Sequence, residues 1–502
     1  MIFILTSIQE DIELFFGVYT ELFTVSILKK YHDFPITVKV TIWFMICSVV
    51  QKAISLITVP IFTRLLSTQE YGMYSIYNSW LQVFMIVCTF RLDYAVFNKG
   101  MSKYPDKRDE YTSSMQGLTA VLTLAMAGIY FLFQQKINAF TGLSTVIILA
   151  IFLELLFSPS VSFWSLRERY DFRYKSVVFI TLLMAVLNPI LGLIGVGVSN
   201  DKGTARILSC IIVQTGFGIW FFVHNLKKGK KLINVGFWKF ALMFNLPLIP
   251  HYFSAYILEQ SDRIMIQKLC GIEAVALYSV AYNAGAIIKI ITNSLNNAII
   301  PWQYRKLEKL ELADLKRNTF QFMLFVAACI MLFVLFAPEF MYILASSKYQ
   351  EAVYVVPPIA SSIFFIFMYS IYANIEFYFD ANKFTAMISM VGAVLNLILN
   401  FICIPLFGYI AASYTSLFCY VIYAMLHCYY VRVIVKRKTK QNLFDRNMIL
   451  LSIGVVFLTI LFSISYLNNK IRYGLILGIV ILLYYKREQI KEMLRMIKKN
   501  KN

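Results

Sequence analysis

The sequence predicts an all-α polytopic membrane protein with about 14 transmembrane helices: two six-helix lobes followed by two C-terminal helices. Three observations predict this fold class. Hydrophobic residues make up 59% of the 502 residues and charged residues only 15%, whereas soluble domains carry about 25% charged residues. The apolar residues occur in runs of about 20, the length that a helix needs to cross a bilayer. A stretch beside the first run also recurs 204 residues later.

Residues 1–35 precede the first predicted span and do not resemble one. They lack the basic start and the cleavage site of a signal peptide, and the acidic segment QEDIE interrupts their apolar residues. We expect this N-terminal extension either to lie along the membrane surface or to derive from a misassigned start codon.

Basic residues support the order of the spans. Windows of about 19 residues place the spans between residues 40 and 485, and lysines and arginines cluster between them, as in KKGKK at 227–231 and KRKTK at 436–440. With the N-terminus on the cytoplasmic side, most basic residues fall in cytoplasmic segments, as the positive-inside rule requires. The sequence therefore predicts that both termini are cytoplasmic.

The repeated stretch predicts how the spans are arranged. RLLSTQEYGMYSI at 64–76 aligns without gaps to KLCGIEAVALYSV at 268–280, which pairs Arg64 with Lys268 and Tyr74 with Tyr278. Gly72 allows its helix to begin close against a neighbour. The copies are six spans apart, so both cross the membrane in the same direction. This describes a parallel repeat about an axis along the membrane normal, a layout typical of transporters.

The repeat sets the expected domain boundaries. The N-lobe is expected to hold spans 1–6 and the C-lobe spans 7–12, and spans 13 and 14 lie in a C-terminal segment that ends in a basic tail. The three parts cover residues 36–226, 227–435 and 436–502.

A polar stripe marks the first span. An ionisable side chain at mid-membrane costs roughly 2.5–3.5 kcal/mol on insertion scales, so Lys52 requires an explanation. Ser48, Gln51 and Ser55 share its face at helical spacing. A continuous polar face is not exposed to lipid and is expected to line a water-filled cavity or a lobe interface.

A longer stripe marks the eighth span. Lys289 shares a helix face with Thr292, Asn293, Asn296 and Asn297. We expect this face to line the same cavity. Asn396 and Asn400, four residues apart in span 11, are candidates to extend it.

Two carboxylates are candidates for coupling to an ion gradient. Glu154 is far from either end of span four. Burial at such a position favours the protonated form of a carboxyl group and allows it to exchange a proton. An ion pair between Glu154 and one of the two lysines is the alternative. Asp262 is the second candidate, although it and Glu259 are expected near a hydrated outer end of their span.

Composition and motifs exclude several other functions. The net charge of +20 comes from short clusters and not from one basic face, so no nucleic-acid partner is expected. The eight cysteines include no CxxC pair, and with only four histidines neither a disulfide framework nor a metal site is expected. Nucleotide-binding and metalloprotease motifs are also missing from the sequence, and no cofactor is expected.

Several motifs carry a family resemblance over residues 36–435. They are LL-x-x-x-EYG at 65–72, Asp262-Arg263 leading to Tyr278-Ser279, FRLDYAVFNKGMSKYPDKRDEYTSS at 90–114 and LNLILNFICIPLFGYIAAS at 395–413. The sequence resembles the polysaccharide-unit flippases of the MOP superfamily, whose fold is shared with the MATE exporters. The Gly-Ala-Ala of the family after IP-x-x-G is replaced by Ala411-Ala412-Ser413, which keeps small residues but removes the glycine.

The resemblance implies a function and roles for the polar residues. It implies a transporter, not an enzyme, in the cytoplasmic (inner) membrane, which moves a polyprenyl-diphosphate-linked oligosaccharide to the outer leaflet by alternating access. Lys52 and Lys289 would then neutralise the diphosphate, with Arg64, Arg91 and Arg263 guiding phosphate or sugar near the cavity mouths. A polysaccharide polymerase, chain-length machinery and membrane lipids are the implied partners.

Three alternatives stay open on the sequence. A MATE-like exporter of cationic drugs requires a cavity dominated by carboxylates, and a peptidoglycan-precursor flippase shares the fold and the basic cavity. A membrane glycan polymerase usually needs a large outer loop, and no predicted outer loop exceeds about 16 residues.

Overall fold

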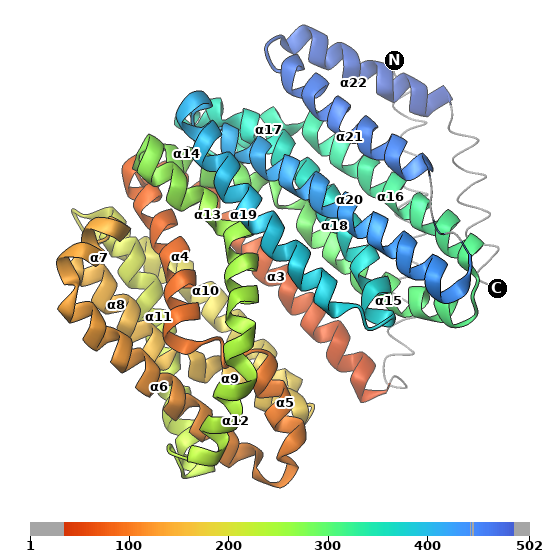
Figure 1. Ribbon diagram of the computed structural model, residues 1–502. Helices are drawn as coiled ribbons and strands as arrows, with labels where there is room; N and C mark the ends of the chain where they lie inside the picture. The colour runs from red at the N-terminus through yellow and green to blue at the C-terminus, as the bar shows by residue number, and fades with distance from the viewer. Residues whose placement is uncertain (1–34, 442, 444–445, 486–502) are drawn as a thin grey trace.

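The computed structural model describes residues 35–485, except residues 442, 444 and 445. The described residues form α-helices joined by short turns and 3-10 segments, without a strand among them, which confirms the all-α class. Figure 1 shows two bundles of helices, one coloured orange to yellow-green and the other green to blue. Of the expected N-terminal extension, residues 1–34 lie outside the described part of the chain.

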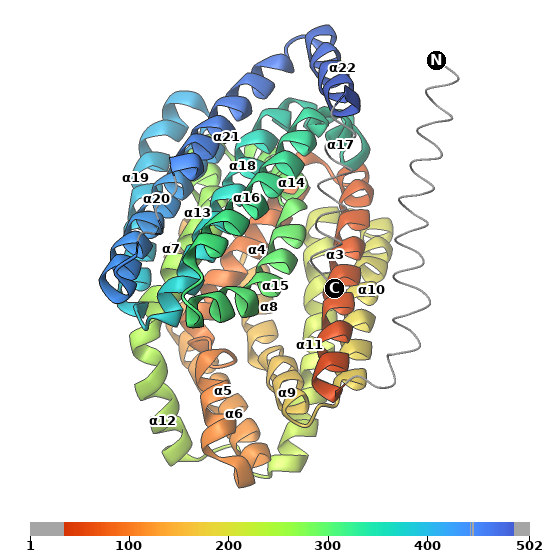
Figure 2. The same ribbon diagram turned by 90° about the vertical axis from the view of Figure 1, so that its right-hand side faces the viewer.

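The first bundle contains nine helices, counted among the described residues. They are α3 (Ile36–Leu65), α4 (Thr68–Thr89), α5 (Ala95–Lys103), α6 (Arg108–Leu132), α7 (Gln134–Thr141), α8 (Thr145–Phe157), α9 (Pro159–Tyr170), α10 (Tyr174–Val198) and α11 (Lys202–Gly229). The helix α11 packs against α4, α6, α8, α9 and α10 and forms the centre of the bundle. The helix α3 packs against α10 at the edge, as Figure 2 shows.

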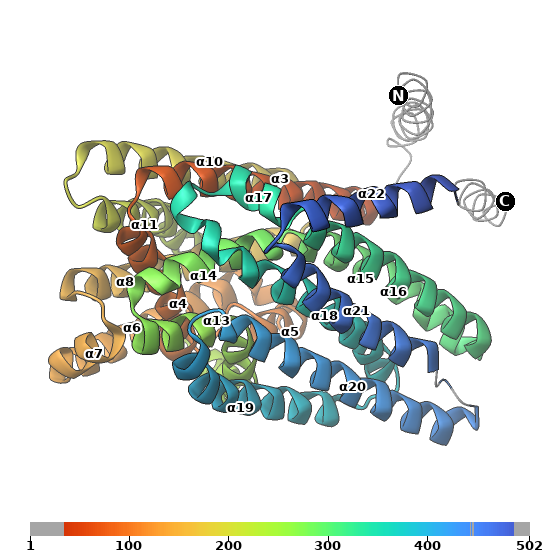
Figure 3. The same ribbon diagram turned by 90° about the horizontal axis from the view of Figure 1, so that it is seen from above.

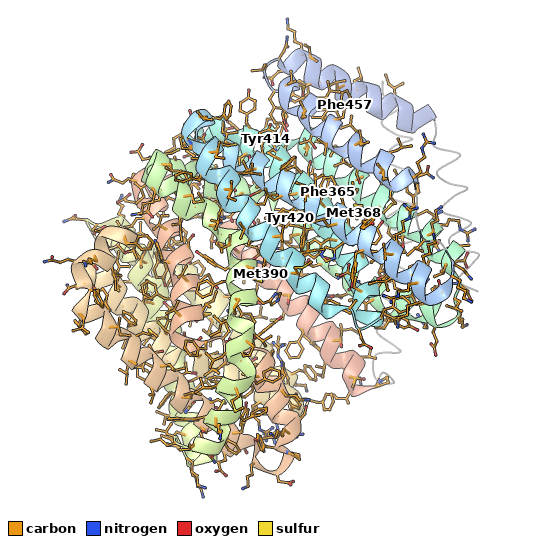
Figure 4. All side chains as sticks on the ribbon, viewed as in Figure 1. Phe365, Met368, Met390, Tyr414, Tyr420 and Phe457 are labelled. Atoms are coloured by element: carbon orange, nitrogen blue, oxygen red, sulfur yellow. The ribbon has the colours of Figure 1, made fainter. Side chains whose placement is uncertain are left out.

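The second bundle has its core around α18. Its helices are α13 (Ile249–Cys270), α14 (Ile272–Gly285), α15 (Ile288–Glu308), α16 (Leu312–Leu335), α17 (Ala337–Leu344), α18 (Val356–Tyr378), α19 (Asn382–Phe407) and α20 (Ala411–Thr439). Phe365 and Met368 of α18, labelled in Figure 4, are at most 1% exposed. The last helices, α21 (Arg446–Ser465) and α22 (Asn469–Tyr485), lie on the outside of this bundle (Figures 1 and 3).

The repeated stretch forms the turn between α3 and α4. Ser67 caps α4: its Oγ accepts from the Glu70 amide at 3.2 Å, and Glu70 Oε2 accepts from the Ser67 amide at 2.7 Å. This reciprocal pair satisfies two amides that the first helical turn leaves free. The matching turn between α13 and α14 is a single glycine, Gly271, with φ +92°, a conformation that glycine adopts without strain.

Each predicted span lies on a helix or a pair of helices, but the count of about 14 is not confirmed. Eleven helical segments of the described chain are long and apolar enough to cross a membrane, and 12 if the pair α14–α15, bent by 42°, counts as one span. The two remaining predicted spans fall on α4 and α22. The helix α22 has only 17 residues, and α4 carries polar residues throughout its first half.

The connection between the bundles is one long helical segment, Val235–Cys270, that a 3-10 turn interrupts. The helix α12 (Val235–Asn245) packs against α5 and α6 of the first bundle, where Trp238 Nε1 donates to the Ser114 carbonyl at 2.9 Å. A 3-10 turn containing Pro247 follows, and α13 then packs against α4, α14 and α19. Proline removes a backbone donor and breaks the helix at this point.

Candidate functional site

Two cavities lie between the bundles and share Glu259 and Gln260 of α13 in their walls. The α3 cavity, of about 820 Å³, is lined by α3, α13, α14 and α15. The α4 cavity, of about 850 Å³, is lined by α4, α13, α15, α18, α19 and α20 and the residues after α4. Both are large enough for a sugar-phosphate headgroup. The shared α13 residues make the two cavities neighbouring compartments of one central space.

The structure brings together the two lysines that the sequence singled out. Lys52 and Lys289 both line the α3 cavity, from α3 and α15 respectively. Ser48 and Ser55 accompany Lys52 in the wall, whereas Gln51 does not line either cavity. The expectation that these polar stripes face a cavity is met at the lysines.

The remaining asparagines of α15 divide between the two compartments. Asn293 and Asn297 line the α3 cavity and Asn296 lines the α4 cavity. Thr292 is only 2% exposed and donates to carbonyls within its own helix. One helix therefore presents amide groups to both compartments, and amides bind sugar hydroxyls by donating and accepting hydrogen bonds.

Lys289 forms an ion pair inside the site. Its Nζ lies 2.5 Å from Oε1 of Glu259, and the two side chains are 33% and 49% exposed. The alternative expectation of a pair between a lysine and Glu154 is wrong for the described residues: Glu154 lies in the other bundle and accepts from Tyr77 Oη at 2.7 Å. The charge of Lys289 is thus balanced by a carboxylate that also faces the cavity.

Arg263 is more deeply placed than a residue at a cavity mouth. Its side chain lines the α3 cavity, yet the residue is only 6% exposed. Its Nε donates to Ser279 Oγ at 3.1 Å and one terminal nitrogen donates to Gln260 Oε1 at 2.8 Å. The guanidinium also lies 4.5 Å from the centre of the Tyr282 ring, a cation–π contact. Arg263 is therefore fixed in position before any substrate arrives.

The α4 cavity has its own basic residues. Arg91 follows α4 with φ 52° and lies 3.5 Å from Asp93 Oδ1, and His251 of α13 lines the same wall. Tyr420 of α20, labelled in Figure 4, lines this cavity and donates to the Leu258 carbonyl at 3.3 Å. Phosphate and sugar groups are both suited to such a wall of arginine and tyrosine.

Arg64 does not line either cavity. Its side chain is exposed at the end of α3, where one terminal nitrogen donates to the Pro60 carbonyl at 2.8 Å and the other to the Ile343 carbonyl at 3.3 Å. Arg64 therefore connects α3 to α17 of the second bundle, and the structure gives it no place near a substrate in the central space.

The surroundings of Asp262 differ from those that the sequence predicts. It was expected at a hydrated end of its span, but it is 2% exposed. Its carboxylate accepts from Tyr278 Oη at 2.5 Å, Asn400 Nδ2 at 2.7 Å and Ser416 Oγ at 2.9 Å. Asn396, expected like Asn400 to extend the cavity wall, is instead buried in the same network, where it accepts from Asn400 Nδ2. The neighbouring helices α14, α19 and α20 exclude water from this point of α13.

This network is a set of oxygen atoms around one carboxylate. Thr415 Oγ1 donates to Asn400 Oδ1, so carboxylate, amide and hydroxyl oxygens lie within one cluster. Such oxygens are the ligands of hard cations. The described residues hold no group of three or more histidine, cysteine or acidic side chains suited to a transition metal.

The chain matches a known protein family. A family model described as "Polysaccharide biosynthesis protein" matches residues 37–305, more than half of the chain. The chain belongs to this family. It is a multi-pass membrane transporter and not an enzyme.

Two relatives and one solved structure extend the family match. "Lsg locus putative protein 1" of Haemophilus influenzae is 23% identical over 378 residues, 71% of this chain and 88% of its own length. "Probable low-salt glycan biosynthesis flippase Agl15" of Haloferax volcanii is 21% identical over 412 residues, 80% of this chain and 85% of its length. The solved structure "Lipid II flippase MurJ, inward closed conformation" superposes with a TM-score of 0.59 at 16% identity. The superposition covers 89% of this chain and 100% of the chain of that structure. This likeness shows that the fold is shared.

Three buried ionisable residues were missed by sequence reasoning. Glu376 and His427 are both 0% exposed and lie 2.7 Å apart in the second bundle. Arg206 of α11 is 5% exposed and donates to Asn188 Oδ1 at 3.0 Å. Glu376 and Arg206 fall near predicted span ends, where hydropathy windows treat a charge as part of a loop. Their burial is set by packing against distant helices, which a window does not register.

Proposed function

We propose that the protein is a flippase that moves a polyprenyl-diphosphate-linked oligosaccharide from the cytoplasmic to the outer leaflet of the cytoplasmic membrane. Its product then enters assembly of a surface polysaccharide, and a polymerase with chain-length machinery is the expected consumer. The observation that carries the proposal is the placement of Lys52, Lys289 and Arg263 around one cavity of about 820 Å³ in a member of the polysaccharide biosynthesis protein family.

The chemistry of the cavity fits this substrate better than the alternatives. A diphosphate carries at least two negative charges, and three basic side chains against one carboxylate, Glu259, give the wall a net positive charge. A cationic drug would be repelled by the same wall. The family relative Agl15 is named a glycan biosynthesis flippase, which also favours a glycan over a drug.

The ion pair supplies a mechanism for substrate entry. In this proposal Glu259 is the ion-pair partner of Lys289 while the cavity is free of substrate, since Nζ and Oε1 lie 2.5 Å apart. An arriving diphosphate replaces the carboxylate as the partner of Lys289, which leaves Glu259 to accept from sugar hydroxyls. Exchange of one anionic partner for another keeps the charge of Lys289 paired within the membrane. Arg91 is proposed to guide the headgroup in the α4 cavity, whereas Arg64 has no substrate role.

Asp262 and Glu154 are proposed as the residues that couple transport to an ion gradient. Asp262 accepts from the hydroxyl groups of Tyr278 and Ser416, which present oxygen to a cation once their hydrogen atoms turn away. Glu154 has a single partner, Tyr77, and suits a proton. The two sites lie in different bundles, so each one is able to respond to a different stage of the cycle.

The topology is part of the proposal. Both termini are cytoplasmic, the lobes cover residues 36–226 and 227–435, and the two rock against each other to expose the central space alternately. The 3-10 turn at Pro247 and the change of packing partners between α12 and α13 support movement at this point.

The test is the location of lipid-linked oligosaccharide in a deletion strain of the host. Wild type is expected to restore delivery to the outer leaflet, and Lys289→Ala is expected to leave the unit on the cytoplasmic leaflet. Lys136→Ala serves as the matched control because Lys136 is exposed on α7, far along the chain from either cavity wall. If the unit reaches the outside in the deletion strain and only polymer length changes, the flippase function is wrong and a polymerase replaces it.

A further inference from the structure

The repeated turns make matching contacts at one end of the molecule. The sequence match begins at Arg64 and Lys268, which are the basic residues in the last turns of α3 and α13. Each of these helices precedes the turn into the next helix of its own bundle. In both copies the residue just before the basic one is also polar, Thr63 in the first and Gln267 in the second, again 204 residues apart.

In the first copy these side chains reach the second bundle. Arg64 donates to the Ile343 carbonyl at 3.3 Å, and Thr63 Oγ1 donates to the Leu344 carbonyl at 3.4 Å. Ser346 Oγ returns a hydrogen bond to the Thr63 carbonyl at 3.2 Å. The end of α3 is therefore fastened to the C-terminal end of α17.

In the second copy the direction is reversed. Lys268 Nζ donates to the Ala139 carbonyl at 3.1 Å, and Gln267 Nε2 donates to the Thr141 carbonyl at 3.1 Å. The end of α13 in the second bundle is thereby fastened to the C-terminal end of α7 in the first. A Cβ at Gly142 would lie 2.4 Å from Gln267 Nε2, so the glycine allows this approach.

The acceptors are equivalent as well. The helices α7 and α17 each have eight residues, and each joins two longer helices of its own bundle. The last carbonyls of a helix have no partner within it and carry partial negative charge, which attracts a cation. The backbone amide that follows α7 donates to the Asn138 carbonyl, and the one that follows α17 donates to the Met341 carbonyl. The carbonyls of Ala139 and Ile343, which Lys268 and Arg64 bind, come after these two in the chain and have no other backbone partner among the described residues.

The two sets of contacts flank the place where the bundles touch. Gly72 of α4 lies there against α14, and a Cβ at this glycine would lie 2.1 Å from the Ile272 carbonyl oxygen. The α4 cavity lies along the other parts of α4 and α13, and the α3 cavity lies along the other parts of α3 and α13. Arg91 marks the opposite end of α4. The contacts therefore close one end of the central space.

We infer that Thr63 with Arg64, and Gln267 with Lys268, form a two-armed latch that holds the bundles together at the end of the molecule where α7 and α17 lie. With both termini cytoplasmic, this is the outer end, so the latch stabilises the state whose central space is open to the cytoplasm. The inference rests on the proposed alternating access, and opening to the outside breaks both arms.

The chemistry of the latch suits a contact that must open. Each arm joins an exposed cation to backbone carbonyls and not to a carboxylate, and the exposed position lets water replace the carbonyl when the contact separates. Each arm is therefore individually weak. Two arms related by the repeat release together, because a rotation that separates one pair of helix ends separates the other.

Electron paramagnetic resonance distances between α7 and α17 test the latch. Spin labels replace Gln135 and Tyr342, which are exposed on these helices, in a background in which exposed Cys270 is serine. In lipid nanodiscs, Arg64→Ala or Lys268→Ala is expected to raise the ratio of the long-distance to the short-distance population roughly fivefold, and the double variant more than either. Lys136→Ala, at an exposed lysine of α7, is expected to leave the ratio unchanged.

An unchanged ratio in Arg64→Ala/Lys268→Ala, measured on protein that elutes as wild type does, would overturn the latch. A cross-link tests it without removing the basic side chains from both arms. Lys268→Cys with Ala139→Cys, joined by a bismaleimide, is expected to hold the short distance and stop transport, and transport at the wild-type rate while cross-linked contradicts the inference. Because the distances are measured without substrate, a population shift in a protein that fails to move lipid-linked oligosaccharide supports the latch and rejects the proposed substrate.

Discussion

Lys289 and Glu259 face each other in the wall of the α3 cavity, with Nζ 2.5 Å from Oε1. The lysine comes from α15 and the glutamate from α13, so the pair joins two helices of the second bundle in the wall of the cavity. Both side chains are partly exposed, and exposed ion pairs contribute about 0–1 kcal/mol to stability. The pair is therefore better explained by what it does to a ligand than by what it adds to the fold.

Removal of Lys289 and removal of Glu259 are expected to have opposite effects on anion binding. Lys289→Ala removes a cation from the cavity wall and is expected to lower transport of lipid-linked oligosaccharide at least tenfold, which corresponds to about 1.4 kcal/mol. Glu259→Gln removes the competing carboxylate and is expected to tighten diphosphate binding severalfold. Binding of a soluble polyprenyl-diphosphate analogue, measured by calorimetry, separates the two effects.

Arginine at the same position supplies the control. Lys289→Arg keeps the charge and is expected to retain most of the binding, although not the single-point geometry of an ammonium group. Equal binding by wild type, Lys289→Ala and Lys289→Arg would remove Lys289 from the proposed mechanism and leave the flippase function intact.

Asp262→Asn is expected to lower stability. The carboxylate accepts three hydrogen bonds, from Tyr278, Asn400 and Ser416, and an asparagine amide turns its own donor toward at least one of them. A buried donor left without an acceptor costs about 1–3 kcal/mol. Thermal unfolding in detergent is expected to show a melting temperature several degrees lower, together with loss of any stabilisation by the coupling cation.

An exposed aspartate controls for the substitution itself. Asp106→Asn, in the 3-10 turn after α5, is expected to melt as wild type does. If Asp262→Asn melts like wild type and still responds to the cation, Asp262 is neither a structural acceptor nor an ion site.

Gly72→Ala is expected to destabilise the contact between the bundles. The added Cβ would lie 2.1 Å from the Ile272 carbonyl oxygen, so the backbone of α4 or α14 must shift. Gly128→Ala in α6 meets nothing within 4 Å and is expected to be neutral or stabilising by up to about 1 kcal/mol. A comparison of the two melting temperatures separates close packing from helix propensity; similar values would contradict the close contact.

Glu154 and Tyr77 allow stability and proton coupling to be separated. Glu154→Gln keeps an acceptor for Tyr77 Oη and is expected to change stability by less than about 1 kcal/mol, whereas Tyr77→Phe leaves a buried carboxylate without its donor and costs about 1–3 kcal/mol. If Glu154 exchanges the transported proton, Glu154→Gln also abolishes the pH dependence of transport. A pH profile that Glu154→Gln leaves unchanged would exclude Glu154 as the coupling residue.

The polar stripes were predictable because helical periodicity is local. Lys52 and Lys289 each lie on one polar face of a membrane-spanning helix, and the cost of exposing a charge to lipid required each face to line a polar space. The repeat at 64–76 and 268–280 was also recognisable from the sequence, since its two copies align without gaps. Neither observation indicated that Lys289 pairs with Glu259, because the register between α13 and α15 depends on the bend of 42° between α14 and α15.

The surroundings of Asp262 and Arg64 could not be predicted in the same way. Asp262 lies close to the end of a hydropathy window, where water is the expected partner, yet residues up to 154 positions away fill that place. The sequence predicts that Arg64 guides phosphate or sugar near a cavity mouth, whereas its long-range partner in the structure is a carbonyl 279 residues away. Such long-range contacts follow from how the bundles dock, which no local pattern contains.

The sequence by itself determined that the chain spans a membrane many times, that it contains a parallel repeat, and that two lysines avoid lipid. These properties follow from the transfer cost of single residues and from periodicity along one helix. The tertiary structure decided which helices form the cavity walls, that Glu259 neutralises Lys289, and that Arg64 and Lys268 fasten opposite bundles. Those facts depend on the relative placement of separate helices, which is set by the packing of the whole molecule.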